Sequence, residues 1–284
     1  MKVLGLVASP RNLGNSEILV KEMLSSLPVD VEKEMIRLPA LDIRPCKACY
    51  ACLPYDKRCV IKDQLASLLD KIKQADAVII ASACYFLGFH TSIKTLSDRM
   101  ISVLANSADF SGKRCVTVTV YGIPGWEGYA REMVNNFARF LHLHVVGDML
   151  VQAASPGEAA VPAVLEQARQ LASALVDPGV GAVPTAHNVL SCQQCGSSFL
   201  QLQPSGKVRC VMCNATGELA PSVDGYSVSF GEENHLRFSP AGMAEHAARL
   251  EAEKANYVAN RHEFYRRRKA YEGYNTWWAN MEEL

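Results

Sequence analysis

Strand-like and helix-like segments alternate through the first 175 residues of this 284-residue chain. Most of the strand-like segments are near-continuous apolar runs, as expected for strands buried on both faces of a sheet. They cover residues 2–9, 31–38, 76–82, 113–122 and 144–154. Segments with helical spacing cover residues 15–27, 62–74, 92–104, 128–143 and 163–175. This alternation predicts an α/β fold with a five-stranded, doubly wound parallel sheet.

The loop after the first predicted strand, SPRNLGNSE, has the composition of a phosphate-binding loop. In such sheets ligands bind beyond the carboxyl ends of the strands, and a helix N-terminus favours an anion. The candidate residues offer hydroxyls, amides, a cation and a flexible glycine: Ser9, Arg11, Asn12, Gly14, Asn15 and Ser16. The loop lacks the GxGxxG and GK[ST] patterns. A turn followed by a capped helix explains the same residues, so both interpretations stay open.

Two stretches of the chain, GLVASPRNLGNSE (5–17) and DAVIIASACYFLGFHTSIKTLSDRM (76–100), resemble the NADPH-dependent FMN reductase branch of the flavodoxin-like proteins. The resemblance covers roughly residues 1–175. It implies a flavodoxin-like fold that binds FMN, with Ser9, Arg11, Asn15 and Ser16 around the phosphate. Cys84 departs from the family pattern. Asp98 and Arg99 are expected to form a structural ion pair.

Two further loops are implied to contact the isoalloxazine ring of FMN. Their candidate residues are Tyr85, Phe86, Leu87 and Gly88 after the third strand, and Tyr121, Gly122, Gly125 and Trp126 after the fourth. Core packing of Tyr85 and Phe86, and an exposed turn anchored by Trp126, are the structural alternatives. No residue pattern marks a catalytic acid, base or nucleophile, which fits electron transfer through a cofactor.

A second sequence feature is the loop CKACYACLPYDKRC, which carries Cys46, Cys49, Cys52 and Cys59. Eight of the ten cysteines fall into two tight groups, and only Cys84 and Cys115 stand alone, without an assigned role. Clustered cysteines in a chain of this size without an export signal indicate metal ligands rather than disulfides. The CxxCxxC run followed by a more distant cysteine resembles the motif of iron-sulfur flavoproteins, which implies a [4Fe-4S] cluster beside FMN. Zinc, or a loop without metal, remains an alternative.

The second cysteine group follows a Pro/Gly/Ala-rich linker, residues 176–188. Cys192 and Cys195 form one CxxC pair, and Cys210 and Cys213 form another, with a PSGK turn between them. Two such pairs on a short hairpin are typical of a zinc ribbon. The arrangement also resembles rubredoxin, so the ion is zinc or a single iron.

We therefore divide the chain into three parts. Residues 1–178 form the FMN-binding domain, with the cluster loop at 46–59, and residues 189–220 form the ribbon module. Residues 221–284 are predicted to contain a short hairpin (225–239) and, from residue 241, a mostly helical tail. The spacing of its apolar residues predicts an amphipathic helix packed on the body or on a partner subunit.

The predicted function is electron transfer between one-electron carriers and a two-electron donor or acceptor. An NAD(P)H-dependent FMN or quinone reductase without a cluster is one alternative, and a redox-sensing or scaffold protein is another. We expect NAD(P)H or a small redox protein as electron donor, and a homodimer or homotetramer. The 29 basic and 29 acidic residues balance, which argues against nucleic-acid and membrane partners. The short first apolar run and the lack of a spanning segment predict a cytoplasmic location.

Overall fold

The structure is a computed structural model that describes residues 1–53, 58–177, 179, 189–223, 225–231, 237–269 and 271–272. Its main sheet has five parallel strands in the order β2-β1-β3-β5-β6, so the predicted fold is confirmed. The strands are β1 (Lys2–Ala8), β2 (Glu32–Arg37), β3 (Ala77–Tyr85), β5 (Arg114–Tyr121) and β6 (His144–Gln152). A short strand, β4 (Gly88–Phe89), pairs antiparallel with the end of β3.

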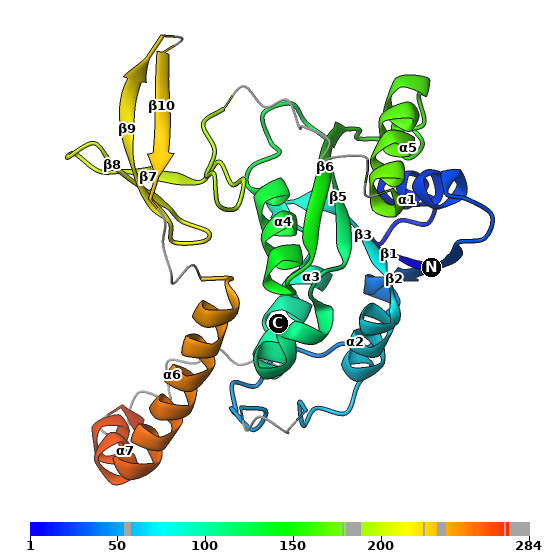
Figure 1. Cartoon of the computed structure of the whole chain (residues 1–284). Coiled ribbons are helices and arrows are strands. Elements are labelled where there is room, and N and C mark those ends of the chain that lie inside the picture. The colour runs from blue at the N-terminus through cyan, green and yellow to red at the C-terminus, as the bar shows by residue number, and fades with distance from the viewer. Residues whose placement is uncertain are drawn as a thin grey trace.

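Helices cover both faces of this sheet (Figure 1). One face carries α1 (Asn15–Ser26) and α5 (Pro162–Val176), and the other carries α2 (Leu65–Gln74), α3 (Thr91–Ser97) and α4 (Ala130–Phe140). Each layer has its own apolar core, because alternate strand residues point to opposite faces. Val3 and Val7 of β1 face the first layer, whereas Leu4 and Leu6 face the second.

The helix predicted over residues 92–104 ends early, which corrects the sequence expectation. After α3 the chain tightens into the 3₁₀ helix η2 (Met100–Phe110); an earlier 3₁₀ turn, η1 (Leu38–Ala40), follows β2. The tightening shows in the i→i+3 bond from the Arg99 N–H to the Leu96 carbonyl, at 3.0 Å. Arg99 is only 2% exposed there, so the break in the helix coincides with a buried cation.

The ribbon module is a four-stranded antiparallel sheet in the order β10-β9-β8-β7. Its strands are β7 (Leu200–Leu202), β8 (Lys207–Cys210), β9 (Thr216–Ser222) and β10 (Gly225–Phe230). The hairpin around PSGK is confirmed as β7–β8. Of the hairpin predicted within 225–239, the first strand is β10, and it pairs antiparallel with the preceding strand β9, whereas residues 232–236 lie outside the described part. β10 therefore belongs to the ribbon sheet and not to the tail.

The tail consists of α6 (Pro240–Ala259) and α7 (Arg261–Lys269), which extend away from the main sheet (Figure 1). Among the described residues of these two helices only Met243 is buried, so α6 does not pack along its whole length on the body of its own chain, and packing on a partner subunit stays a prediction. Lys254 reaches the cysteine loop, where its Nζ donates to the Tyr50 carbonyl at 3.3 Å. The aromatic residues beyond 272 lie outside the described part.

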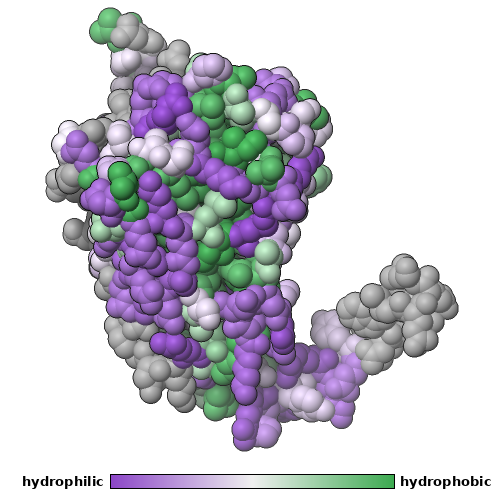
Figure 2. All heavy atoms as spheres, turned by 90° about the vertical axis from the view of Figure 1, so that its right-hand side faces the viewer, coloured by the Kyte–Doolittle hydropathy of each residue, from purple (hydrophilic) through white to green (hydrophobic). Residues whose placement is uncertain are grey.

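The exposed surface bears on two other expectations. None of the described helices is both long and apolar enough to cross a bilayer. Figure 2 shows a band of apolar side chains between polar ones on the side of α1, α2 and α5. Exposed apolar bands are common at interaction surfaces. Self-association of the chain stays a prediction.

Candidate functional site

A cavity of about 270 Å³ opens at the carboxyl ends of β1, β3, β5 and β6. It brings together predicted cofactor residues from three loops: Ser9, Arg11, Gly14, Asn15, Ser16, Tyr85, Tyr121 and Gly122. Sequence reasoning missed five other lining residues: Ala83, Cys84, Val120, Ala153 and Ala154. All five lie at or just beyond the last residues of their strands, and the parallel register aligns Ala83 with Val120 and Val120 with Val151. The topology alone could have suggested them.

The remaining predicted cofactor residues are not part of this lining. They are Asn12, Phe86, Leu87, Gly88, Gly125 and Trp126. Two of them are large and exposed, with Phe86 at 97% and Trp126 at 61% exposure. The interpretation of Phe86 as core packing therefore does not hold. Phe86 instead sits at the tip of the loop that follows a pocket-lining residue, Tyr85.

The first loop forms a backbone cradle at the N-terminus of α1. Gly14 is the N-cap residue, and no side chain caps the helix there. A Cβ on Gly14 would lie 3.0 Å from the Arg11 Cβ, 3.2 Å from the Arg11 carbonyl oxygen and 3.6 Å from the Ser9 Oγ. The first N–H groups of a helix without a side-chain cap are available to an anion. The residues present therefore fit the phosphate of a flavin mononucleotide.

Two charged residues, Arg37 and Glu17, hold the shape of this loop. Arg37 donates from Nη1 to the Arg11 carbonyl at 2.7 Å and pairs with Glu17. Glu17 also accepts from the Leu13 N–H at 2.7 Å. Burial alone would raise the pKa of Glu17, but hydrogen bonds from Lys21, Leu13 and Arg37 outweigh it and lower the pKa. Glu17 is thus ionised at neutral pH and fixes Leu13 at a positive φ of 50°.

Asn15 uses its whole side-chain amide to join the first loop to the loop after β6. Its Nδ2 donates to the carbonyls of Ala153 at 3.2 Å and Ser155 at 2.9 Å. Its Oδ1 accepts from the N–H groups of Gly157 at 2.9 Å and Ala159 at 3.3 Å. Asn15 thus closes one wall of the pocket through protein contacts.

The loop after β3 is a tight hairpin in an unusual backbone conformation. Its two central residues, Phe86 and Leu87, have positive φ values of 48° and 64°, and Cys84 and Tyr85 pair with β4 on the other side. The sequence implied only that this loop contacts the flavin; the structure shows that two non-glycine residues adopt left-handed conformations there, which is uncommon.

The cysteine loop begins at the carboxyl end of β2, where Arg37 is in register with Val7 of β1. Cys46 and Cys49 are exposed, whereas Cys52 and Cys59 are half-buried; residues 54–57 lie outside the described part. Burial raises the pKa of Cys52, and the thiols of Cys59, Cys49 and Cys46 raise it further. The charges of the other three thiols thus act on Cys52.

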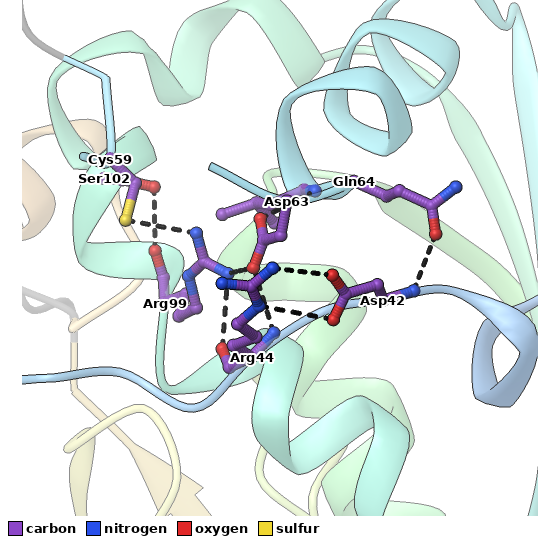
Figure 3. A network of polar contacts seen from close by, with 8 residues as sticks. Asp42, Arg44, Cys59, Asp63, Gln64, Arg99 and Ser102 are labelled. Atoms are coloured by element: carbon purple, nitrogen blue, oxygen red, sulfur yellow. Dashed lines mark hydrogen bonds and ion pairs between the residues drawn. The ribbon is translucent and has the colours of Figure 1, made fainter. Parts of the chain in front are cut away.

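A buried ion pair lies beside the cysteine loop and is hydrogen-bonded to it (Figure 3). Arg99 pairs with Asp63, and their side chains are only 1% and 0% exposed. Arg99 also donates to the Arg44 carbonyl at 3.2 Å and to the Cys59 Sγ at 3.1 Å. It therefore joins both arms of the cysteine loop. The expected pair between Asp98 and Arg99 is wrong: Asp98 pairs with Lys94.

Asp63 is held ionised by this arrangement. Burial would raise its pKa, but the Arg99 guanidinium and the N–H groups of Arg44 and Leu65 donate hydrogen bonds that lower it. A small cavity of about 70 Å³ adjoins the pair, with Cys59, Arg99, Ser102 and Phe110 in its lining.

The second cysteine group converges on one point. The Sγ atoms of Cys192, Cys195, Cys210 and Cys213 all lie within 4.8 Å of one another, and the four residues are buried. Two of the Sγ pairs, 192–213 and 195–210, are 3.6 Å apart. Sulfurs bound to a single tetrahedral ion at a Zn–S distance of about 2.3 Å would be about 3.8 Å apart. The ribbon therefore has the geometry of a one-ion site.

The first group differs from the ribbon in this respect. Within the described ranges its sulfurs do not reach the mutual distance found in the ribbon. Among the described residues, the ribbon cysteines alone therefore converge on a one-ion geometry.

Backbone N–H groups support the sulfurs of the ribbon. Hydrogen bonds from the thiols of Cys195 and Cys213 lower the pKa of Cys210, with help from the Cys213 and Met212 N–H groups. The pKa of Cys195 is raised by the same thiol contacts. A central cation relieves this competition, because it lets all four sulfurs carry charge.

The two single cysteines have different surroundings. Cys84 lines the pocket, and its Sγ lies 3.6 Å from the Trp126 carbonyl oxygen. Cys115 is fully buried in the second core layer, where burial strongly raises its pKa. Cys115 is therefore a packing residue.

Comparisons with known proteins agree with this geometry. Residues 1–156 match the family described as NADPH-dependent FMN reductase. An iron-sulfur flavoprotein of Methanosarcina thermophila is 30% identical over 152 residues, covering 52% of this chain and 78% of the relative. Another, of Methanocaldococcus jannaschii, is 39% identical over 100 residues, which is 35% of this chain and 51% of the relative. The chain thus spans about half the length of the latter.

A solved structure described as flavone reductase superposes with a TM-score of 0.74 at 21% identity, over 99% of both chains. At this identity the likeness shows the fold alone, and it extends over the ribbon and the tail. The family model matches more than half of the chain, and the chain has the flavodoxin-like sheet with its pocket. Together these observations show the family. The chain belongs to the NADPH-dependent FMN reductase family of flavin-dependent oxidoreductases.

Proposed function

We propose that this chain binds FMN at the carboxyl edge of its sheet and a [4Fe-4S] cluster on Cys46, Cys49, Cys52 and Cys59. FMN can exchange one or two electrons, whereas a cluster passes one at a time. The proposed activity is electron transfer between one-electron carriers and a two-electron donor or acceptor. The observation that carries the proposal is that one chain offers both a pocket of about 270 Å³ at the carboxyl edge of its sheet and a loop with four free cysteines.

The pocket residues divide the work of holding FMN. The N–H groups of the first turn of α1, with the hydroxyls of Ser9 and Ser16, would hold the phosphate. Tyr85 and Tyr121 stand at the ends of β3 and β5, where they would flank the ring. The side-chain amide of Asn15 binds the loop after β6, so it fixes this wall of the pocket and does not contact the ligand.

The cluster side depends on thiolates and on Arg99. The four cysteines would supply one thiolate to each iron, and the guanidinium Nη2 of Arg99 would donate to the Cys59 sulfur. In the ribbon, we propose a structural zinc ion, with a single iron as the alternative. NAD(P)H or a small redox protein would donate electrons, and we expect a cytoplasmic homodimer or homotetramer.

A second candidate function is an NAD(P)H-dependent reductase of planar, apolar compounds such as quinones, with no cluster. The exposed side chains of Phe86, Trp126 and Ile123 (60% exposed) near the pocket favour it, since exposed apolar residues at a pocket rim suit an apolar substrate. The similar structure described as flavone reductase is named for a planar aromatic substrate of this kind. A redox-sensing or scaffold protein is the third possibility.

One preparation distinguishes these functions. The protein is purified without oxygen, its visible spectrum is recorded, and FMN, iron, acid-labile sulfide and zinc are counted per chain. Flavin bands on a broad iron-sulfur shoulder, with iron and sulfide in the ratio of a cubane, support the first function. Flavin bands without sulfide support the reductase, and a colourless protein that keeps zinc supports the scaffold.

A further inference from the structure

We propose that the metal-loaded ribbon braces the flavin-side hairpin, residues 84–89, through a contact chain that runs from Cys195 through Phe199 and Tyr129 to Leu87. The expected consequence, weaker FMN binding, rests on the proposed FMN site. The contacts between the ribbon and the hairpin do not depend on it. It gives the ribbon a role in the flavin domain that does not need electron transfer through the ribbon.

The hairpin needs such a brace because its conformation is costly. Phe86 and Leu87 both lie in the left-handed region, at φ values of 48° and 64°. Non-glycine residues are disfavoured in that region, so the surroundings must impose the turn. The pocket feels any relaxation, because Cys84 and Tyr85 at the base of the hairpin line it.

Two neighbouring residues impose the turn. The N–H of Tyr129 donates to the Leu87 carbonyl at 2.8 Å. The backbone of Gly128 packs so closely that a Cβ there would lie 2.4 Å from the Leu87 Cβ. The Tyr129 ring also lies against Gly88, whose added Cβ would be 3.3 Å from the ring atom Cε2. Tyr129 therefore determines the shape of the hairpin.

The ribbon contacts Tyr129 from the other side. The rings of Phe199 and Tyr129 meet edge to face, with centroids 6.1 Å apart and an interplanar angle of 62°. Ser198, next to Phe199, donates from its hydroxyl to the Glu132 Oε1 at 2.8 Å and from its N–H to the same oxygen at 3.2 Å. Glu132 lies one helical turn from Tyr129 and is 4% exposed. The ribbon therefore makes two contacts here. The apolar one joins the rings of Phe199 and Tyr129, and the polar one joins Ser198 to Glu132.

Glu132 is a firm base for this contact. Its Oε1 also accepts from the Arg131 Nη1 at 3.2 Å, and Arg131 makes two hydrogen bonds of 2.8 Å to Asp148 of β6. Asn135 donates to the same Asp148 at 2.9 Å. The ribbon thus docks on a part of α4 that is tied to the main sheet.

The docking segment is set by the metal site itself. The Ser197 carbonyl accepts from the Cys192 N–H at 2.8 Å, and the Ser197 hydroxyl accepts from the Phe199 N–H at 3.1 Å. The Ser197 N–H donates to the Cys195 sulfur. Ser197 is fully buried. The four sulfurs of the ribbon lie within 4.8 Å of one another, so one bound cation would hold them together and fix this turn, and with it the position of Phe199.

The test combines ribbon variants with hydrogen exchange. Phe199→Ala removes the ring contact, and Leu202→Ala on β7 of the same ribbon, 58% exposed, is the matched control. An edge-to-face pair contributes about 0.5–1.5 kcal/mol, so Phe199→Ala should speed amide exchange over residues 84–89 by about 2- to 10-fold. The FMN dissociation constant should rise by a similar factor, and Leu202→Ala should change neither quantity.

Removal of the ribbon metal tests the other end of the contact chain. A Cys210→Ser protein, which loses the ion, should show the same faster exchange at 84–89. The double variant with Phe199→Ala should show little faster exchange than either single variant, because both changes remove the same brace. Tyr129→Leu changes the same contact from the flavin domain and leaves the ribbon sequence intact. Metal content of each variant is measured alongside.

The outcomes separate this inference from the proposed function. Exchange at 84–89 that is unchanged in Phe199→Ala, Tyr129→Leu and Cys210→Ser overturns the brace. Additive effects of Phe199→Ala and Cys210→Ser overturn the link to the metal. Faster exchange in a protein that binds no FMN supports the brace and refutes the FMN site.

Discussion

The Nη2 of Arg99 donates a hydrogen bond to the Sγ of Cys59 at 3.1 Å, while the same guanidinium pairs with Asp63. A cation that is 2% exposed and points at a ligand sulfur is a strong local influence on a cluster, because water screens it little. Hydrogen bonds to ligand sulfurs stabilise the more negative, reduced state. Arg99 therefore belongs to the electronic surroundings of the proposed cluster as well as to the core.

Arg99→Lys should lower the reduction potential of the cluster. Lysine keeps the charge near Asp63 but lacks the planar fork that reaches a second partner. A redox titration followed by electron paramagnetic resonance measures the change. The control is Lys94→Gln, which changes a surface cation of α3 that pairs with Asp98. This variant should leave the potential unchanged. An Arg99→Lys protein with full iron and the native potential would contradict this role.

The Arg99–Asp63 pair should make stability depend on acid. The pKa of Asp63 is lowered in the folded state, so the pair stabilises the protein fully above the unfolded value of about 3.9. That contribution is lost as the pH falls through the lower, folded pKa. Urea unfolding of the wild type and Asp63→Asn over a pH series measures it.

Asp63→Asn leaves Arg99 buried without a counter-charge, which should cost about 3–5 kcal/mol near neutral pH. The difference between the two proteins should shrink as the pH drops below about 4. A constant difference across the series would show that Asp63 does not titrate with folding.

Cys49→Ser should remove the cluster and spare the flavin. Cys49 is exposed on the loop and contributes no atom to the pocket lining, so iron and sulfide should fall while FMN per chain stays constant. Metal and sulfide analysis with the visible spectrum reports both. Cys115→Ser, which changes a buried packing cysteine, should keep the iron. Full iron and sulfide in Cys49→Ser would refute the ligand assignment.

Gly128→Ala should destabilise the protein by roughly 1–3 kcal/mol. An added Cβ would meet the Leu87 carbonyl oxygen at 2.5 Å, in addition to the strain of a φ of 53°. Gly125→Ala is a matched control, since Gly125 also has a positive φ, 77°, but open space around it. Urea unfolding of the pair separates contact from strain; equal losses would show that the close approach to Leu87 has no energetic weight.

The sequence was sufficient to predict the sheet, because strand periodicity and parallel connectivity leave few topologies. The first pocket loop followed from the rule that ligands bind at the carboxyl ends of strands, and the loops after β3 and β5 followed from the resemblance to FMN reductases. The ribbon followed from its two CxxC pairs, whose sulfurs the structure brings together around one point.

Long-range partners could not be predicted in this way. Asp98 and Arg99 are adjacent in sequence, but adjacent residues on a helix do not face each other. Arg99 instead meets Asp63, 36 residues away, which only the packing of α2 against η2 decides. Likewise Gly217 and Pro221 weaken the strand pattern of β9, so the sequence does not predict that β10 pairs with it.

The position of Cys84 has a practical consequence for studying this protein. When both four-cysteine groups hold their metals and Cys115 stays buried, Cys84 is the one thiol left for an alkylating reagent. It lies in the pocket wall, so its rate of labelling becomes a native reporter of whether the flavin is in place.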